Sequence, residues 1–309
     1  MKTDINHLPA NKQRELDHVV EMLFQGFREA TQDAKGRKKS ARILKVILFG
    51  SYARGDWVDA PLDANQFKSD YDILVIVNQK ELADRAAYWA ETEQRLVDAY
   101  LVERSIRTPV NFIVHSLQEV NDALAHGRVL FSEIVKDGTI LYQSDDRLLA
   151  SAKPKTPEQA YLAAKEYFEE MFPAGMRRFK GAQFYISEGY LRDAAYDLQQ
   201  ATERLYQCVL LTLTFYTPYD HNIIFLRSLA EGLDRKLFDV WPRGTKAERS
   251  LFQKLKEAYR KAQYSKHFKI SLEELTWLQA HIQTLGECVH EICTNHIAEL
   301  KAAADRLES

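Results

Sequence analysis

The sequence predicts an α/β region with a small mixed sheet, followed by an all-helical bundle. In the first half, short apolar runs bounded by glycine, proline or polar residues alternate with helical patterns. Beyond Lys153 strand-like alternation disappears, and apolar residues recur at three- and four-residue steps. A length of 309 residues also favours two domains over one. We therefore expect domains at 1–146 and 158–309, joined by a linker at 147–157.

The first half alternates runs typical of buried strands with amphipathic stretches typical of helices. Strands are expected at 43–50 (ILKVILFG), at 70–77 (DYDILVIV), at 110–116 (VNFIVHS), and after the Asp137-Gly138 turn. Helices are expected over 12–33, over 80–104, which has neither Gly nor Pro, and from Ser116 onward.

The second half begins after a stretch with two prolines, SAKPKTPEQ, which is typical of a linker. Thr156 and Pro157 fit the N-cap and the first position of a helix. Helices are then predicted at 157–172, 174–188, 190–216, 220–232, 245–263 and 271–306. No strand pattern interrupts them, which favours a helical bundle.

Composition limits the class of protein. The chain has 42 basic and 44 acidic residues, so no overall basic charge indicates a nucleic-acid binder. Its 3 cysteines lack framework spacing and indicate reduced thiols. The N-terminus has no apolar signal region, and the apolar run at 208–216 is too short to span a bilayer. We expect a soluble, cytoplasmic protein without a membrane partner.

Asp70 and Asp72 stand one residue apart at the start of the second predicted strand. Because strand side chains alternate, both carboxylates are expected on one face, close together. Neighbouring carboxylates repel and raise each other's pKa, and a divalent cation removes the conflict. Mg²⁺ prefers one or two carboxylates together with phosphate oxygens and water. The pair therefore predicts a Mg²⁺ or Mn²⁺ site suited to phosphoryl or nucleotidyl transfer.

Gly50 and Ser51 follow the first predicted strand and are expected to begin a helix. Glycine permits a close backbone approach, and Ser51 offers a hydroxyl and an N–H to phosphate. Arg54, one turn further, could add positive charge. Separately, a Gly-Ser turn and an Asp-x-Asp pair are usually structural. Their order of strand, turn, helix and strand favours a nucleotide site.

The residues FGSYARGD and SDYDILVIV together resemble the DNA polymerase β-type nucleotidyltransferase superfamily. The resemblance covers about 12–145 and is strongest to the minimal nucleotidyltransferases related to kanamycin nucleotidyltransferase. It implies transfer of a nucleotide, commonly AMP from ATP, to a protein, RNA or small-molecule acceptor. It also implies that Asp70 and Asp72 hold Mg²⁺ while Gly50 and Ser51 contact the nucleotide phosphates.

The chain departs from this family in two places. The first is the insertion at 56–69, whose Asp56, Asp59 and Asp63 are expected to be solvated loop charges. The second is Asn111, which occupies the position of the family's third carboxylate on the next strand. An asparagine offers a carbonyl oxygen but cannot deprotonate a hydroxyl. His115, on the same strand face, is either a replacement base or a structural residue.

The second half carries a basic stretch with interleaved tyrosines at 254–270. Arg260 and His267 are seven residues apart, which places them on one face if a single helix continues through both. Arginine and histidine could support cleavage of a phosphodiester. A basic helix face is otherwise usually just solvated. The nearby CVHEICTNH (288–296) is expected to supply core and surface residues rather than a metal site.

The helical half also resembles the HEPN domains, which are often fused to minimal nucleotidyltransferases. The resemblance rests on the Arg260 to His267 spacing, at the long end of the family's range. It implies a homodimer through this half and, in many members, a metal-independent ribonuclease. In related toxin–antitoxin pairs the nucleotidyltransferase adenylylates a tyrosine two residues after the histidine. That position is Lys269 here, and Tyr264 is the nearest substitute.

Three functions follow from these patterns. The first is a Mg²⁺-dependent nucleotidyltransferase whose helical half binds substrate or forms the dimer. The second is a toxin-like ribonuclease that uses Arg260 and His267, acts on RNA and is regulated by the first domain. The third is a nucleotide-sensing module in which Asn111 has removed turnover.

Overall fold

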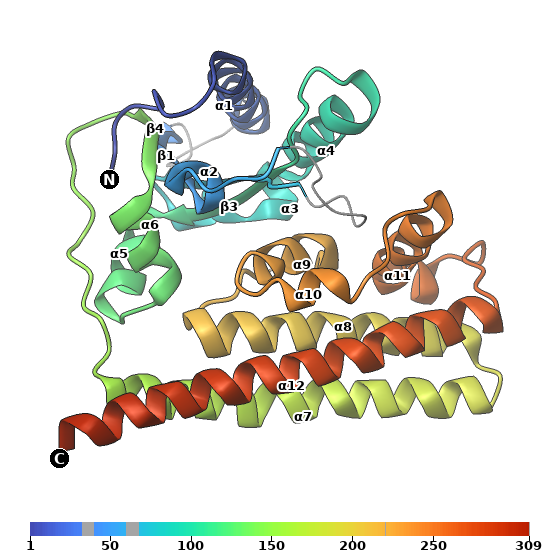
Figure 1. Cartoon of the computed structure of the whole chain (residues 1–309). Coiled ribbons are helices and arrows are strands. Elements are labelled where there is room, and N and C mark those ends of the chain that lie inside the picture. The colour runs from blue at the N-terminus through green and yellow to red at the C-terminus, as the bar shows by residue number, and fades with distance from the viewer. Residues whose placement is uncertain (33–39, 60–67, 220, 309) are drawn as a thin grey trace. The chain divides into compact units, whose positions relative to one another are not determined.

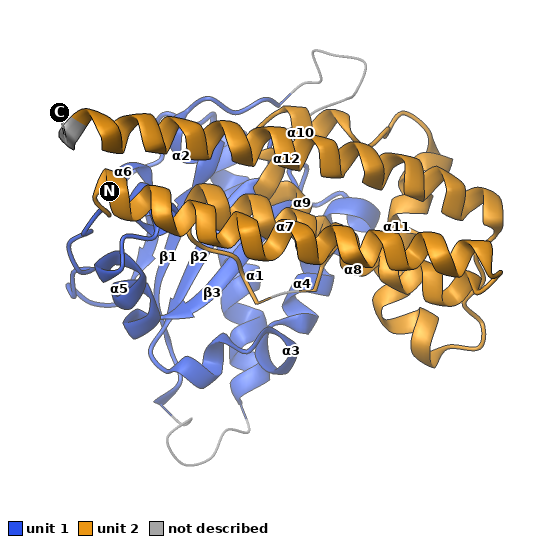
Figure 2. Ribbon diagram, turned by 90° about the horizontal axis from the view of Figure 1, so that it is seen from below, with its two compact units in different colours: residues 1–62, 67–154 blue, residues 63–66, 155–309 orange. Residues whose placement is uncertain are grey.

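The computed structural model describes residues 1–32, 40–59, 68–219 and 221–308. The described residues up to Pro154 form one compact unit, and those from Lys155 onward form another (Figure 2). The first unit combines a four-stranded sheet with helices, and the second contains only helices among its described residues. The predicted fold class is therefore confirmed.

The elements of the first unit follow in chain order (Figure 1). They are α1 (Ala10–Thr31), β1 (Ile43–Phe49), α2 (Gly50–Arg54), β2 (Tyr71–Val77), the 3-10 turn η2 (Lys80–Ala83), α3 (Arg85–Tyr88), α4 (Ala90–Asp98), the π turn η3 (Ala99–Glu103), β3 (Val110–Ser116), α5 (Leu117–Ala125), α6 (Val129–Asp137) and β4 (Thr139–Gln143).

The sheet has the order β3-β2-β1-β4. The β2–β3 pair is parallel, and β1 runs antiparallel to both β2 and β4. One face packs on α1 and α4 through a core that includes Leu16, Val19, Ile73 and Val75. The α5–α6 pair covers the other face (Figure 1). Because β2 is central and covered on both sides, its residues from Ile73 to Val77 are all buried, as their apolar run predicts.

The single helix expected over 80–104 is wrong. The stretch divides into η2, α3, α4 and η3, because two side chains interrupt it. Asp84 accepts a hydrogen bond from the Ala87 N–H and begins a new helix. The Trp89 indole donates to the Leu82 carbonyl at 2.7 Å and stacks on Phe27 at 5.3 Å between ring centroids. Burying this large ring bends the chain at Trp89, which a periodicity pattern does not reveal.

The second unit consists of six helices among its described residues. These are α7 (Pro157–Ser187), α8 (Leu191–Thr214), α9 (Ile223–Glu231), α10 (Lys236–Asp239), α11 (Lys246–Tyr264) and α12 (Leu272–Glu308). The long helices α7, α8 and α12 run alongside one another (Figure 1). Their shared core includes Phe179, Leu198, Leu205, Leu278 and Leu285.

The start of α7 follows the prediction, whereas its expected break at Pro173 is wrong. Thr156 and Gln159 form a capping box, and Pro157 occupies the first turn. The helix then continues through Pro173. An interior proline costs about 3 kcal/mol. Close packing of α7 on α8 offsets that cost: Gly175 lies so close to Leu205 that an added Cβ would meet its Cγ at 3.3 Å.

Two further expectations concern membranes and metals. None of the described helices combines the length and apolar character that a bilayer crossing requires. In the described part of the chain, no group of three or more His, Cys, Asp or Glu side chains is arranged to hold a metal ion. Cys293 of the CVHEICTNH stretch is buried in the helical core, as expected for a packing residue.

Candidate active site

The candidate site lies where β1 ends and β2 and β3 begin. Asp72 pairs with Phe49 of β1 on one side and with Asn111 of β3 on the other. Tyr71 packs in the core against α1. Since side chains alternate along a strand, Asp70 and Asp72 face the opposite side. The sheet register therefore brings the paired aspartates, Asn111 and the residue before Gly50 to one edge.

Asp70 and Asn111 contact each other directly. The Asn111 Nδ2 donates to Asp70 Oδ2 at 2.6 Å, and both side chains are partly buried. Asn111 therefore contacts the acidic pair through Asp70. It supplies a donor to the acidic pair and adds no further negative charge.

Asp72 lies in an environment that disfavours its ionised form. Burial and the charge of Asp70 raise the pKa of Asp72 well above its usual range. The Asn111 side chain and the more distant Arg54 oppose this rise without cancelling it. The protein therefore holds two carboxylates together at an energetic cost, which is typical of functional sites.

Gly50 brings the turn after β1 against this carboxylate. An added Cβ at Gly50 would meet Asp72 Oδ2 at 2.3 Å, and Gly50 has a φ of +71°. Only glycine combines this left-handed conformation with so close an approach. The backbone of the Gly50-Ser51 turn consequently lies directly beside the acidic pair.

Helix α2 is held in place by a buried ring contact and by hydrogen bonds to its backbone carbonyls. Tyr52 is fully buried and lies against Tyr71, with 4.5 Å between ring centroids. The carbonyls of Tyr52 and Ala53 contact the side chains of His7 at 2.8 Å and Lys2 at 3.0 Å. Because Tyr71 separates the two aspartates, this ring contact ties the Gly-Ser turn to the acidic pair.

Arg54 ends α2 at the edge of the site. Its Nε donates to Asp56 Oδ2 at 3.2 Å, and both side chains are largely exposed. Its positive charge also reaches Asp72, whose pKa it lowers in part. The charge of Arg54 therefore acts on Asp72, although its direct partner is Asp56, and a role in nucleotide binding stays a prediction.

The aspartates of the 56–69 insertion have different surroundings. Asp56 fits the expected exposed charge, and Asp63 lies outside the described residues. Asp59 is also exposed, as expected, but it is paired as well. Asp59 Oδ1 pairs with the buried Lys12 at 2.8 Å and with Lys68 at 3.5 Å. Lys12 needs a counter-charge because an unpaired buried ammonium is unstable.

His115 cannot act as a base at this edge. It pairs with Ile76 in the parallel register, four residues beyond Asn111 on β3. At about 3.3 Å per residue, that separation is roughly 13 Å. His115 instead lies 3.8 Å from Glu119, in the capping box that starts α5, with its ring 5.4 Å from that of Phe131. The structural interpretation of His115 therefore holds.

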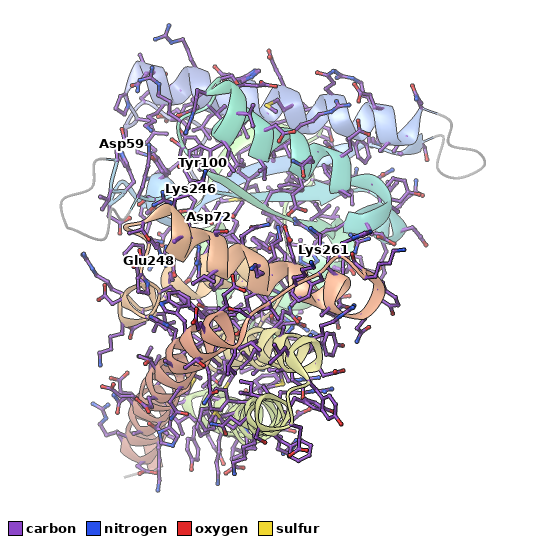
Figure 3. The ribbon with its side chains drawn as sticks, turned by 90° about the vertical axis from the view of Figure 1, so that its right-hand side faces the viewer. Asp59, Asp72, Tyr100, Lys246, Glu248 and Lys261 are labelled. Atoms are coloured by element: carbon purple, nitrogen blue, oxygen red, sulfur yellow. The ribbon has the colours of Figure 1, made fainter. Side chains whose placement is uncertain are left out.

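The donor set fits a divalent cation. Asp70 and Asp72 provide hard carboxylate oxygens. The pKa of Asp72 is raised by burial and by the charge of Asp70, and a cation would offset both effects. Asn111 could turn its carbonyl oxygen toward a cation only by giving up its hydrogen bond to Asp70. Mg²⁺ and Mn²⁺ commonly bind through one or two carboxylates, with water or phosphate oxygens at the remaining positions. Figure 3 draws the side chains of the described residues, and Asp72 is labelled there.

The predicted pair of the helical unit is not on one helix face. Helix α11 ends at Tyr264, so Arg260 lies on the helix while His267 follows in a turn. Both side chains are exposed. Their assignment as a ribonuclease pair stays a prediction.

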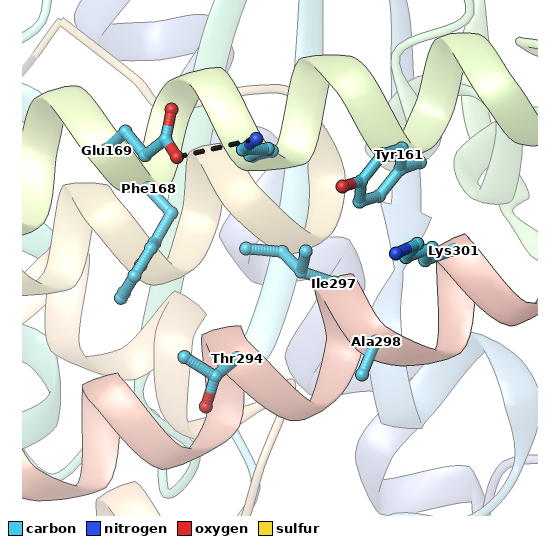
Figure 4. A pocket seen from close by; sticks show the side chains of 8 residues that line it. Tyr161, Phe168, Glu169, Thr294, Ile297, Ala298 and Lys301 are labelled. Atoms are coloured by element: carbon cyan, nitrogen blue, oxygen red, sulfur yellow. Dashed lines mark ion pairs between the residues drawn. The ribbon is translucent and has the colours of Figure 1, made fainter.

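Two pockets of the helical unit contain none of the predicted residues. One, of about 280 Å³, lies between α7 and α12 and is lined by Tyr161, Phe168 and Ile297, among others (Figure 4). The other, of about 570 Å³, is polar and includes Arg178 and Asp197, which pair at 2.9 Å. These pockets add no residue to the acidic site.

Sequence reasoning missed Lys12 and Glu15 of α1, which contact the residues that flank the aspartates. Lys12 Nζ donates to Thr108 Oγ1 at 2.7 Å, and Glu15 Oε2 accepts from the Tyr71 hydroxyl at 3.0 Å. The sequence of α1 nevertheless contains one sign that Lys12 is buried. Lys12 continues the apolar stripe of Leu16 and Val19 toward the N-terminus of α1, where a charged residue is unusual.

Among known proteins, a family model matches part of the first unit and a solved structure matches over most of the chain. Residues 34–147 match a family model described as "Polymerase beta, Nucleotidyltransferase". No curated protein matches the chain. Solved structures that match include a nucleotidyltransferase-like protein from Exiguobacterium sibiricum 255-15, with 13% identity over 91% of this chain and 78% of that one. Its TM-score of 0.27 is too low to support a conclusion about this chain. The family match supports nucleotidyl transfer in general for the first unit.

Proposed function

We propose that the protein is a metal-dependent nucleotidyltransferase that transfers AMP from ATP to a protein, RNA or small-molecule acceptor. The observation that carries this proposal is the contact between the Gly-Ser turn and the acidic pair. A Cβ at Gly50 would lie 2.3 Å from Asp72 Oδ2, so phosphates bound at the turn would be next to the aspartates. The match of residues 34–147 to a nucleotidyltransferase family supports the same reaction class.

Each residue has a distinct role in this proposal. Asp70 and Asp72 hold Mg²⁺ or Mn²⁺, which when bound neutralises negative charge on the phosphate oxygens. The backbone N–H groups of Gly50 and Ser51, with the Ser51 hydroxyl, bind and orient the triphosphate. Arg54 adds positive potential at the same edge.

Asn111 limits what the chain itself can do. Its amide donates to Asp70 and orients that carboxylate, but it takes no proton. The proton of the acceptor's attacking hydroxyl must therefore leave to another group, such as water. This feature also supports the alternative of a nucleotide-sensing module that binds ATP without turnover.

A transfer assay separates the two functions. We expect the purified protein to move label from α-³²P-ATP to an acceptor in the presence of Mg²⁺. Asp70→Asn should reduce transfer by on the order of 10³-fold, because several kcal/mol of charge stabilisation is lost. Asp122→Asn, on the exposed side of α5, is the matched control and should retain full transfer.

Three results of this assay would each contradict a different part of the proposal. Transfer that persists unchanged in Asp70→Asn would exclude the acidic pair as its site. ATP binding without transfer to any acceptor would favour the sensing module. Faster transfer with GTP, CTP or UTP than with ATP would replace AMP as the transferred group.

For the helical unit we propose substrate binding or formation of a homodimer, on its resemblance to HEPN domains. The alternative, a ribonuclease with toxin-like activity, requires Arg260 and His267 to act together. RNA cleavage in EDTA that is lost in His267→Ala would support this alternative. RNA that stays intact with the wild-type protein would count against it.

A further inference from the structure

A buried lysine joins α1 to two separate segments of the first unit. Lys12 is 2% exposed. Its Nζ lies 2.8 Å from Asp59 Oδ1 and 2.7 Å from Thr108 Oγ1. Asp59 lies after α2, and Thr108 lies just before β3. A buried ammonium keeps its charge only with such partners, so the three side chains hold one another in place.

Glu15 extends this network toward the acidic site. Its carboxylate accepts hydrogen bonds from the backbone N–H groups of Arg107 and Thr108, the latter at 2.9 Å. It also accepts from the hydroxyls of Thr108 and Tyr71, each at 3.0 Å. Lys12 Nζ lies 3.6 Å from the same carboxylate. One side chain of α1 thus fixes the turn before β3 and the residue between the two aspartates.

These contacts meet at the strand ends that carry the site. The Tyr71 N–H donates to the Pro109 carbonyl at 2.8 Å, next to Thr108. Tyr71 pairs with Val110, which sets Asp72 beside Asn111 in the same register. A shift of the 107–109 turn would therefore move Asn111 relative to both aspartates.

Asp59 connects the same network to the residues just before Asp70. Lys68 Nζ lies 3.5 Å from Asp59 Oδ1 and donates to the Arg107 carbonyl at 2.7 Å. Ser69 is buried and exchanges two hydrogen bonds with Val58, both at 2.9 Å. The residues just before Asp70 are thus held by contacts that lead back to α1 through Asp59.

We propose that Lys12 and Glu15 are positioning residues that set the spacing of Asp70, Asp72 and Asn111 for cation binding. The inference rests on the proposed function, in which the aspartates hold a divalent cation. Ligands of a metal must be held to within about 0.5 Å of their productive positions. Residues behind the ligands commonly supply that precision, and their loss typically weakens metal binding by 10–100-fold.

The test is a Mn²⁺ titration of the full chain, followed by electron paramagnetic resonance, together with thermal unfolding. Lys12→Met removes the buried charge with little change in volume and should weaken Mn²⁺ binding by about 10–100-fold. Tyr71→Phe removes only the hydroxyl that contacts Glu15. The loss of this one hydrogen bond should also weaken Mn²⁺ binding, by about threefold or more.

Lys45→Met is the matched control. Lys45 is also a buried lysine of the sheet, 3% exposed, and its Nζ lies 3.5 Å from the Asp145 carbonyl. It belongs to the end of β1 away from Phe49, so its loss should change thermal stability but leave the Mn²⁺ dissociation constant unchanged. A purely structural role for Lys12 would change stability in the same way, without the change in affinity.

The outcomes separate this inference from the proposed function. If Asp72→Asn abolishes Mn²⁺ binding while Lys12→Met and Tyr71→Phe bind like wild type, the inference is wrong and the metal site stands. If the wild-type protein binds no Mn²⁺, both are wrong. If Lys12→Met does not fold, Tyr71→Phe decides: unchanged affinity overturns the inference, and weaker binding supports it.

Discussion

Asp72→Asn is expected to abolish nucleotide transfer and at the same time to stabilise the fold at neutral pH. Transfer should fall by on the order of 10³-fold or more, because the variant loses a carboxylate ligand. Stability should rise by about 0.5–2 kcal/mol, as is common when strain at a functional site is relieved. A purely structural aspartate would show the opposite pattern, with lower stability and unchanged transfer.

The gain in stability follows from the direction of the Asp72 pKa. Burial and Asp70 raise the pKa of Asp72 in the folded state above its unfolded value of about 3.9. The ionised form is therefore disfavoured by folding. The stabilising contribution of protonated Asp72 is present below the unfolded value and is lost as pH rises through the folded pKa. Asparagine carries no charge, so the variant escapes this loss.

Thermal unfolding over a pH series without metal checks this result. The unfolding temperature of Asp72→Asn should exceed that of wild type at pH 7, and the difference should vanish as pH falls below about 4. Mg²⁺ should then raise the unfolding temperature of the wild type but not that of the variant. Asp122→Asn should behave like wild type throughout. A variant less stable than wild type at pH 7 would contradict the assigned repulsion.

Gly50→Ala is expected to be nearly inactive and also less stable. The φ of +71° costs a residue with a Cβ about 1–2 kcal/mol. The new methyl group would also lie 2.3 Å from Asp72 Oδ2, so either the carboxylate or the turn must move. A shift of about 1 Å in a reacting geometry can cost on the order of 10²-fold in rate. We expect a loss of at least that size.

Gly189→Ala separates the two causes. Gly189 has a similar φ of +78°, and no atom lies within 4 Å of an added Cβ. This variant of the helical unit should lose comparable stability through backbone strain alone and keep full transfer. Steady-state rates and thermal unfolding of both variants make the comparison. If Gly50→Ala kept wild-type transfer, the turn would not contribute to the site.

The fold was predictable where local patterns agree with burial. The runs that became β1 and β2 are largely apolar on both faces, which is typical of a covered sheet. The breaks around Trp89 and the continuity of α7 through Pro173 were not predictable. Both depend on packing partners far away in the sequence, Phe27 for Trp89 and α8 for α7.

The candidate site was predictable only where a short local motif carries it. Gly50, Ser51, Asp70 and Asp72 belong to short motifs whose spacing carries the chemistry. The contact of Asn111 with Asp70 depends on pairing between β2 and β3, which the strand order only suggests. The contacts of Lys12 join α1 to residues more than forty positions away, and no local pattern encodes them.

The central claim is that one bound cation links the acidic pair to phosphates held at the Gly-Ser turn. A crystal structure with Mn²⁺ and a non-hydrolysable ATP analogue, with anomalous diffraction data, tests it most directly. The claim predicts a Mn²⁺ peak bonded to carboxylate oxygens of Asp70 and Asp72, and phosphate oxygens at the N–H groups of Gly50 and Ser51. Nucleotide bound elsewhere, or a peak that does not contact both aspartates, would contradict it.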